Sequence, residues 1–79
     1  MKAKVKTGKL KKLFGIRIKI LRLMADLTQE ELAEKIDVTL NTIGHIERGI
    51  SGTNFENLVK LSLVFKVEVK DLFNFDSLN

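Results

Sequence analysis

The chain is predicted to fold as a single all-α domain of five helices, and three observations support this. Apolar residues recur at intervals of three and four, the period of an α-helix, through most of the sequence. No proline interrupts the 79 residues, so helices can run without breaks. The chain is 44% apolar and 30% charged, which suits one small hydrophobic core and is too apolar for a disordered chain.

The first helix is expected to start after Thr7 or Gly8 and to run to about Ala25. Its core-facing residues are Phe14, Ile18, Leu21 and Ala25. A second apolar stripe, centred more than about 100° around the same helix, consists of Leu13, Ile16, Ile20 and Leu23. This second stripe needs a partner of its own. We expect extra core beneath the N-terminal arm or beneath Phe75 and Leu78, or else a subunit interface.

A second helix is expected to begin at a capping box formed by Thr28-Gln29-Glu30-Glu31. In that motif the Thr28 hydroxyl meets the Glu31 amide, and the Glu31 carboxylate reaches back to the Thr28 amide. The helix is expected to end near Ile36. Its buried face consists of Leu32, Ala33 and Ile36.

The next segment, Asp37-Val38-Thr39, is long enough only for a tight turn. Thr39 can cap a third helix that runs through Arg48, with Ile43 and Ile46 as its core positions. Gly49 is expected to end this helix in the left-handed conformation that glycine favours after a last turn. The two short helices and their turn therefore form a helix-turn-helix.

The last two helices are expected between Asn54 and Phe73. Asn54 is a good cap for the fourth helix, and the inward face of that helix is predicted to comprise Phe55, Leu58, Leu61, Ser62 and Phe65. A short fifth helix is indicated by Val69, Leu72 and Phe73. The predicted organisation is thus a basic N-terminal arm (1–9), the helical domain (10–74) and a C-terminal tail (75–79).

Positive charge is concentrated in the N-terminal third. Residues 1–25 contain seven Lys and two Arg without any acid, whereas the remainder has five basic and ten acidic residues. Such a field attracts a polyanion, although a solvated basic tail would have the same composition. A membrane-surface role for this segment is a weaker reading, because the domain needs the apolar face of its first helix.

Several classes of function find no support in the sequence. The chain has one histidine, no cysteine, no glycine-rich phosphate loop and no paired carboxylates outside solvated helix positions, so we expect no enzyme and no catalytic residues. His45 has no second ligand within a turn, so no metal site and no cofactor are expected. Basic residues interrupt each apolar run, which excludes a leader or membrane span, and a cysteine-free chain fits the cytoplasm.

The stretch TQEELAEKIDVTLNTIGHIERG closely resembles the helix-turn-helix of the Cro/repressor (XRE-like, lambda-repressor-like) family. The resemblance extends outward through FGIRIKILR and NFENLVKLSLVFKVEVKDLF, so that residues 13–73 are covered. It implies a lambda-repressor-like fold in which the third helix (39–48) lies in the major groove of double-stranded DNA. The basic arm would then follow the backbone or enter a minor groove.

The resemblance also implies roles for individual residues. Base edges would be read by Leu40, Asn41, Thr42, Gly44 and His45. Asn41 is the best candidate, because its amide can pair with adenine, and Leu40 is unusual, because the family mostly has a polar residue there. Phosphates would be held by Thr28, Gln29, Thr39 and Arg48. Arg22 and Glu47 match positions that form a partly buried ion pair between the first and third helices.

Some positions depart from the family pattern. Asp26, Asp37 and Lys66 stand at helix ends where glycine is common, so left-handed backbone is expected there. Thr53 replaces a frequent proline. Glu68 replaces the Ser or Thr that usually caps the fifth helix, which puts the start of that helix in doubt.

The expected function is sequence-specific DNA binding by a transcriptional regulator, a repressor or a controller protein, that works as a homodimer. Helix 5 is the default dimer interface and the second stripe of helix 1 is the rival. The alternative is a protein-interaction module of the same fold, such as an antitoxin or adaptor. The operator sequence, the sign of regulation and the biological context stay open at this point.

Overall fold

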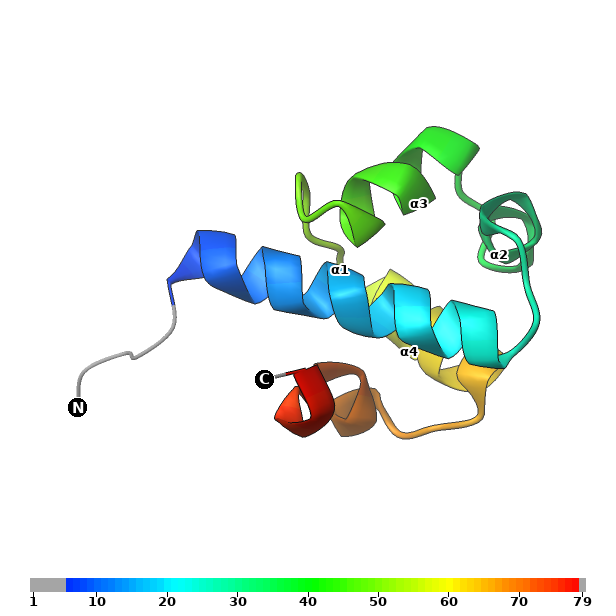
Figure 1. Cartoon of the computed structure of the whole chain (residues 1–79). Coiled ribbons are helices and arrows are strands. Elements are labelled where there is room, and N and C mark those ends of the chain that lie inside the picture. The colour runs from blue at the N-terminus through cyan, green and yellow to red at the C-terminus, as the bar shows by residue number, and fades with distance from the viewer. Residues whose placement is uncertain (1–5, 79) are drawn as a thin grey trace.

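Four α-helices and two short 3₁₀ helices build the protein in a computed structural model that describes residues 6–78. They are α1 (Thr7–Met24), α2 (Gln29–Lys35), α3 (Leu40–Glu47), α4 (Phe55–Phe65), η1 (Val69–Phe73) and η2 (Asp76–Leu78). The long α1 crosses the middle of the molecule, with α2 and α3 on one side, η1 and η2 on the other, and α4 behind it (Figure 1). This arrangement confirms the predicted all-α, lambda-repressor-like class.

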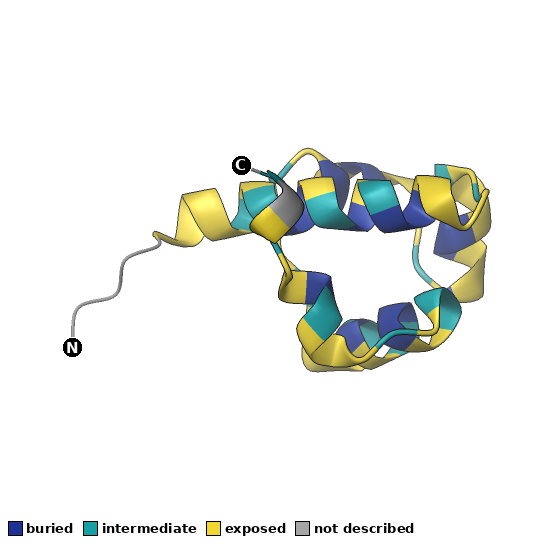
Figure 2. Ribbon diagram, turned by 60° about the horizontal axis from the view of Figure 1, so that its bottom comes forward, coloured by how far each residue is buried: buried dark blue, intermediate teal, exposed yellow. Residues whose placement is uncertain are grey.

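The core lies between α1 and the elements around it. Figure 2 shows α1 exposed in its first turns and carrying buried residues further along. The buried apolar side chains are Phe14, Ile18, Leu21, Leu32, Ala33, Ile36, Ile43, Ile46, Leu58, Leu61 and Leu72. All of these are positions that the helical spacing predicts. Among residues 6–78, no helix is both long and apolar enough to cross a lipid bilayer.

The helix ends adopt the backbone that the sequence predicts for them. Asp26, Asp37 and Lys66 have φ of 58°, 59° and 57°, and Gly49 has φ of 73°. All four are therefore left-handed, and each follows a helix or its cap. Aspartate tolerates this region better than lysine does, so Lys66 is the most strained of the three non-glycine residues.

The prediction of a fifth α-helix is wrong, because Val69–Phe73 forms the 3₁₀ helix η1. Glu68 stands where a Ser or Thr hydroxyl usually caps this helix. Its backbone amide instead donates to Asp71 Oδ2 over 2.9 Å. Two predicted core positions are also exposed, namely Phe55, at 85% exposure, and Ala25. Phe55 is the first residue of α4 and Ala25 is the C-cap of α1, so each lies past the segment of its helix that the neighbouring elements cover.

The second stripe of α1 is partly covered by the C-terminal tail. Residues 76–78 form η2, which packs against α1, and Phe75 packs against the core and lies edge-on to Phe73, which itself stacks on Phe14. Leu13 and Ile20 are half-buried, whereas Ile16 and Leu23 stay exposed. The N-terminal arm lies mostly outside the described residues, and its last three positions, 7–9, belong to α1.

Candidate nucleic-acid interface

The third helix is held against the rest of the domain by its inner face. Ile43, Ile46 and Glu47 are buried there. Gly15 of α1 crosses so close that a Cβ at this position would lie 2.3 Å from the carbonyl oxygen of Ile46. Only glycine permits this approach. The close crossing fixes the C-terminal half of α3, and buried Ile43 anchors its N-terminal half, from which Leu40 and Asn41 stay exposed.

A buried ion pair ties α1 to the same end of α3. Arg22 Nε donates to Glu47 Oε2 over 2.7 Å, and Arg22 Nη2 donates to Glu47 Oε1 over 3.1 Å. The two side chains are only 9% and 2% exposed. A third arginine donor, Nη1, reaches the Leu27 carbonyl oxygen at 2.8 Å. The guanidinium and the carboxylate thus compensate each other's charge, and their hydrogen bonds offset the cost of burying them.

Gln29 joins this network from the first turn of α2. Its Nε2 donates to Glu47 Oε1 over 3.0 Å. Sequence reasoning assigns Gln29 to a DNA phosphate and does not foresee this contact, because the spacing of 18 residues between them carries no local signal. The contact links α2, α3 and α1 through one carboxylate.

The start of α2 is capped as predicted. Thr28 Oγ1 accepts from the Glu31 amide over 3.0 Å, and Glu31 Oε1 accepts from the Thr28 amide over 2.9 Å. The hydrogen bonds from Thr28, its backbone amide first, lower the pKa of Glu31 below its ordinary value of 4.5. The Thr28 hydroxyl thus acts as the acceptor of the cap.

The start of α3 is capped in a similar way by Thr39. Its hydroxyl oxygen accepts from the Thr42 amide over 3.1 Å and lies 2.9 Å from the Thr42 hydroxyl oxygen. Both hydroxyls therefore serve the cap. Thr42 is half-buried as a result of this arrangement.

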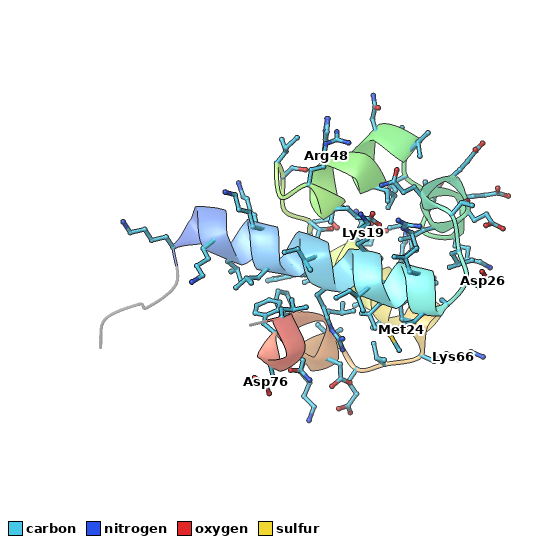
Figure 3. The ribbon with its side chains drawn as sticks, viewed as in Figure 1. Lys19, Met24, Asp26, Arg48, Lys66 and Asp76 are labelled. Atoms are coloured by element: carbon cyan, nitrogen blue, oxygen red, sulfur yellow. The ribbon has the colours of Figure 1, made fainter. Side chains whose placement is uncertain are left out.

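The outer face of α3 presents three exposed side chains, which are Leu40, Asn41 and His45. Gly44 is buried between them, because the guanidinium of Arg48 lies over it: a Cβ at Gly44 would be 3.1 Å from Arg48 Nη1. Arg48 extends from α3 on the side away from α1 (Figure 3). Of the five predicted base-reading residues, Leu40, Asn41 and His45 are the ones whose side chains face outward.

Two lysines of α1 extend this surface. Lys12 and Lys19 each lie three residues before a residue that contacts α3, namely Gly15 and Arg22, so they flank the α1–α3 crossing. Lys12 packs so tightly on the loop after α3 that a Cβ at Gly49 would lie 2.8 Å from its Cα. Sequence reasoning does not single out these two lysines, although their seven-residue spacing, the same as that of Gly15 and Arg22, places them on one side of α1.

The family model described as "Helix-turn-helix" matches residues 18–72, more than half of the chain. The chain belongs to the helix-turn-helix family. This confirms the predicted family and, with it, the class of function, DNA-binding regulation of transcription. The match begins within α1 and ends in η1, so it spans α2, α3 and the Arg22–Glu47 pair, while Lys12 and Gly15 lie just before it.

Individual relatives agree with this assignment. The control protein C.BamHI of Bacillus amyloliquefaciens is 33% identical over 73 residues, which cover 91% of this chain and 90% of the relative. An uncharacterized HTH-type transcriptional regulator of Archaeoglobus fulgidus is 37% identical over 60 residues, which cover 76% of this chain and 84% of the relative. These relatives are named as regulators and not as enzymes.

Solved structures give the same fold. The restriction-modification controller protein C.AhdI from Aeromonas hydrophila superposes with a TM-score of 0.75 at 32% identity, covering 80% of this chain and 96% of that one. The clp gene regulator ClgR from C. glutamicum gives a TM-score of 0.72 at 25% identity, covering 80% and 82%. A hypothetical transcription factor from Neisseria, at 18% identity and a TM-score of 0.76 over 92% and 84%, supports the fold alone.

Proposed function

We propose that this chain binds double-stranded DNA in a sequence-specific manner, with α3 in the major groove, and regulates transcription as a repressor or controller protein. The observation that carries the proposal is the division of α3 into two faces. Its inner face is buried against α1 and α2, while Asn41 and His45 project from the outer face, where nothing in residues 6–78 covers them. A helix presented in this way fits the major groove.

Base recognition is assigned first to Asn41. Its position in the first turn of α3 is where recognition helices approach base edges, and its amide offers adenine both a donor and an acceptor. Leu40, 49% exposed, suits a thymine methyl group. His45 lies one turn further along α3 and is assigned to base recognition as well. Thr42 would contribute to recognition through the Thr39 cap, which sets the start of α3, and Gly44 through Arg48, which lies over it.

Phosphate contacts are assigned to the rim of the same surface. Arg48 and Lys12 lie beside the loop after α3, and Gln29 lies in the first turn of α2, whose amide dipoles favour an anion. The hydroxyl oxygens of Thr28 and Thr39 accept from the capped amides, and a hydroxyl that accepts one hydrogen bond can still donate its own proton to a phosphate oxygen at the helix start. The contacts supply affinity and register, while base contacts supply the choice of sequence.

Two copies are proposed to bind one operator. A single small domain contacts few base pairs, and a two-fold pair of domains reads two half-sites. The relationship to C.BamHI and C.AhdI favours a controller of restriction-modification genes as the biological setting. Among residues 6–78, no group of three His, Asp or Glu side chains is placed to hold a metal ion.

The decisive experiment is selection of bound duplexes from a random library at two salt concentrations. We expect a two-fold symmetric motif from the wild-type chain. Asn41→Ala should lose preference at one base pair of each half-site, a change of about 1–3 kcal/mol in discrimination. Asn57→Ala, which removes the same amide from α4, is the matched control and should recover the wild-type motif.

Failure to recover any motif at either salt concentration would contradict the proposal. It would favour the alternative, a protein-interaction module of the same fold that acts as an antitoxin or adaptor. Groove binding must also weaken steeply with salt, because contacts to phosphates release counterions. An affinity for DNA that does not change with salt would likewise count against α3 in the groove.

A further inference from the structure

A small apolar cavity lies beside the first turns of α1, between that helix, the loop before α4 and η1. Its volume is about 270 Å³. The apolar side chains that line it are Leu10, Phe14, Phe55, Leu58 and Phe73. The rings of Phe14 and Phe73 stack with their centroids 5.1 Å apart, so the wall of the cavity is largely aromatic. We call it the aromatic cavity.

The electrostatic surroundings of the aromatic cavity are positive. Lys11 lines it, and no acidic side chain does. Lys9 and Lys12 also lie in the first two turns of α1, and no side chain caps the start of that helix, so its first amides are open to an anion. The acids closest in sequence to the lining residues are already engaged: Glu56 pairs with a lysine, and Asp71 accepts from a backbone amide.

Thr53 adds a polar group that folding does not satisfy. Its hydroxyl oxygen is buried, and within residues 6–78 it has no hydrogen-bond partner. A buried hydroxyl without a partner costs free energy, so such an atom is uncommon in a folded domain. Because Thr53 also lines the aromatic cavity, an acceptor group seated there would supply the missing partner.

We propose that the aromatic cavity binds a small aromatic carboxylate, with its ring beside Phe14 and Phe73 and its carboxylate at Lys11 and Thr53. Aromatic rings pack favourably on one another in offset or edge-on contact. A carboxylate only accepts hydrogen bonds, and the ammonium, the hydroxyl and the open helix amides can all donate them. The volume lies just below the usual range of about 300–1,000 Å³, which suits a single ring with a short acidic side chain.

The aromatic cavity borders the loop that follows α3. Gly52 and Thr53 line the cavity, and Gly49 of the same loop lies so close to Lys12 that a Cβ there would be 2.8 Å from the Lys12 Cα. A bound carboxylate therefore places negative charge near the edge of the proposed DNA surface. We expect it to weaken DNA binding, because it repels a phosphate at that edge. This consequence rests on the proposed function, whereas binding of the carboxylate does not.

The first test titrates phenylacetate into the full chain and follows backbone amides by nuclear magnetic resonance. We expect saturable shifts at Lys11, Thr53 and Phe73 with a dissociation constant of about 1 mM or lower. Acetate, which lacks the ring, and 2-phenylethylamine, which reverses the charge, should each bind roughly tenfold more weakly or worse.

Three results of this titration would overturn the proposal. The first is equal affinity for phenylacetate and 2-phenylethylamine, and the second is no saturation at the amides of the cavity. The third is a set of shifts centred on the groove that Met24 and Lys66 border at the other end of α1. Shifts that follow the concentration of protein and not that of phenylacetate would show that a second copy of the chain fills the cavity, which also overturns it.

Thr53→Val separates a role in binding from a role in folding. It removes the unpartnered hydroxyl with little change of shape, so the free protein should melt at the same temperature or higher. Its affinity for phenylacetate should nevertheless fall by roughly tenfold, because a hydrogen bond to a charged group is lost. Thr53→Ser keeps the hydroxyl and is the matched control. Equal affinities of Thr53→Val and wild type would remove Thr53 from the site.

Lys11→Gln tests the positive charge in the same way. It should weaken phenylacetate binding by about three- to fivefold, as expected for an ion pair that is open to solvent. Lys9→Gln removes the same charge from the same helix at a position that does not line the cavity, and it should bind like the wild type. Equal losses in both variants would show that net charge alone attracts the ligand, and would overturn the assigned site.

DNA binding is measured separately, by fluorescence anisotropy with and without saturating phenylacetate. The dissociation constant for DNA is expected to rise about threefold or more, and sodium acetate at the same concentration controls for added salt. An unchanged constant would overturn the coupling. A chain that binds phenylacetate but no DNA would contradict the proposed function and leave the cavity assignment standing. Specific DNA binding without any phenylacetate binding would have the opposite meaning.

Discussion

Glu47 is the residue on which the geometry of the recognition helix depends most. Its carboxylate accepts hydrogen bonds from Arg22 and from Gln29, and its side chain is 2% exposed. A buried arginine that loses this partner keeps its charge without compensation. The contribution of Glu47 is therefore to hold three helices in register, and not to contact DNA.

Glu47→Ala is accordingly expected to destabilise the domain by about 3–5 kcal/mol, since it leaves a buried charge unpaired. Urea denaturation followed by circular dichroism measures this. Glu56→Ala, which removes an exposed partner of Lys60, is the control and should cost about 0.5 kcal/mol or less. A Glu47→Ala protein as stable as the wild type would show that the ion pair contributes nothing to folding.

Glu31 makes the start of α2 sensitive to acid. Because hydrogen bonds from Thr28 lower its pKa in the folded state, its contribution to stability is present above the unfolded pKa, ordinarily 4.5. That contribution is lost as the pH falls through the lower, folded pKa. The contribution of Glu31 to stability is therefore constant at neutral pH and changes with pH only below about pH 5.

We expect Glu31→Gln to flatten the fall in unfolding free energy between about pH 5 and pH 3, measured by urea denaturation at a series of pH values. Glu30→Gln is the matched control, since the Glu30 carboxylate accepts no hydrogen bond within residues 6–78, and its profile should follow the wild type. Identical profiles for wild type and Glu31→Gln would rule out the capping carboxylate as a source of acid sensitivity.

At the scale of the elements, the crossing of α1 and α3 depends on the absence of a side chain at Gly15. A methyl group there would overlap the carbonyl oxygens of Ile46 and Glu47, at 2.3 and 2.7 Å, and these backbone atoms cannot rotate away. The helices would have to separate, and the buried contacts on both sides of the crossing would be lost.

Gly15→Ala should therefore destabilise the domain by about 2–3 kcal/mol and lower the affinity for DNA, because α3 changes its position. Gly8→Ala is a sharp control in the same helix, since a Cβ at Gly8 meets nothing within 4 Å. It should stabilise α1 by up to about 1 kcal/mol. Thermal melts of the two variants that shift in the same direction would contradict this account.

The sequence predicts the elements best where local chemistry defines them. The capping box at Thr28, the cap at Thr39 and the stop at Gly49 each involve residues within four positions of one another, and all three are present. The sequence predicts Phe55 on the inward face of α4, yet it is exposed. Periodicity shows which side of a helix a residue lies on, but it does not show how far along the helix the neighbouring elements extend. Val69–Phe73 is too short for its apolar spacing to distinguish a 3₁₀ from an α-helix.

The candidate site shows the same division between local and distant contacts. The spacing of the family motif places Asn41 and His45 on the exposed face of α3. The contact of Gln29 with Glu47 and the position of Arg48 over Gly44 depend on rotamers and on the docking of helices. Neither is encoded in the spacing of residues along the chain, so both were found only in the structure.

For the whole molecule, the distribution of charge sets how DNA binding responds to salt. Lys12 packs on the loop after α3, whereas Lys70 lies in η1, which is on the other side of α1 from α3 (Figure 1). In the proposed complex Lys12 is placed to neutralise a phosphate when α3 enters the groove, and Lys70 is not. The basic residues of α1 are thus divided between faces: Lys12 packs on the loop after α3, while Arg17 donates to the Asp71 carbonyl oxygen in η1.

Lys12→Ala is expected to reduce the slope of log K against log salt by about 0.9, the value for one phosphate contact on duplex DNA, without a change in the preferred sequence. Lys70→Ala should leave the slope unchanged, because its exposed ammonium lies away from that face. Fluorescence anisotropy across a range of potassium chloride concentrations gives both slopes. Equal slopes for the two variants would place the DNA elsewhere on the domain.

The two-faced construction of α3 also affects how this protein can change over evolutionary time. Ile43, Ile46 and Glu47 hold the helix, while Leu40, Asn41 and His45 take no part in the core. Mutations at the exposed positions are therefore nearly free of selection for folding. New operators can be acquired by exchanging two or three side chains on an unchanged scaffold, and a designer can reprogram specificity at the same few codons.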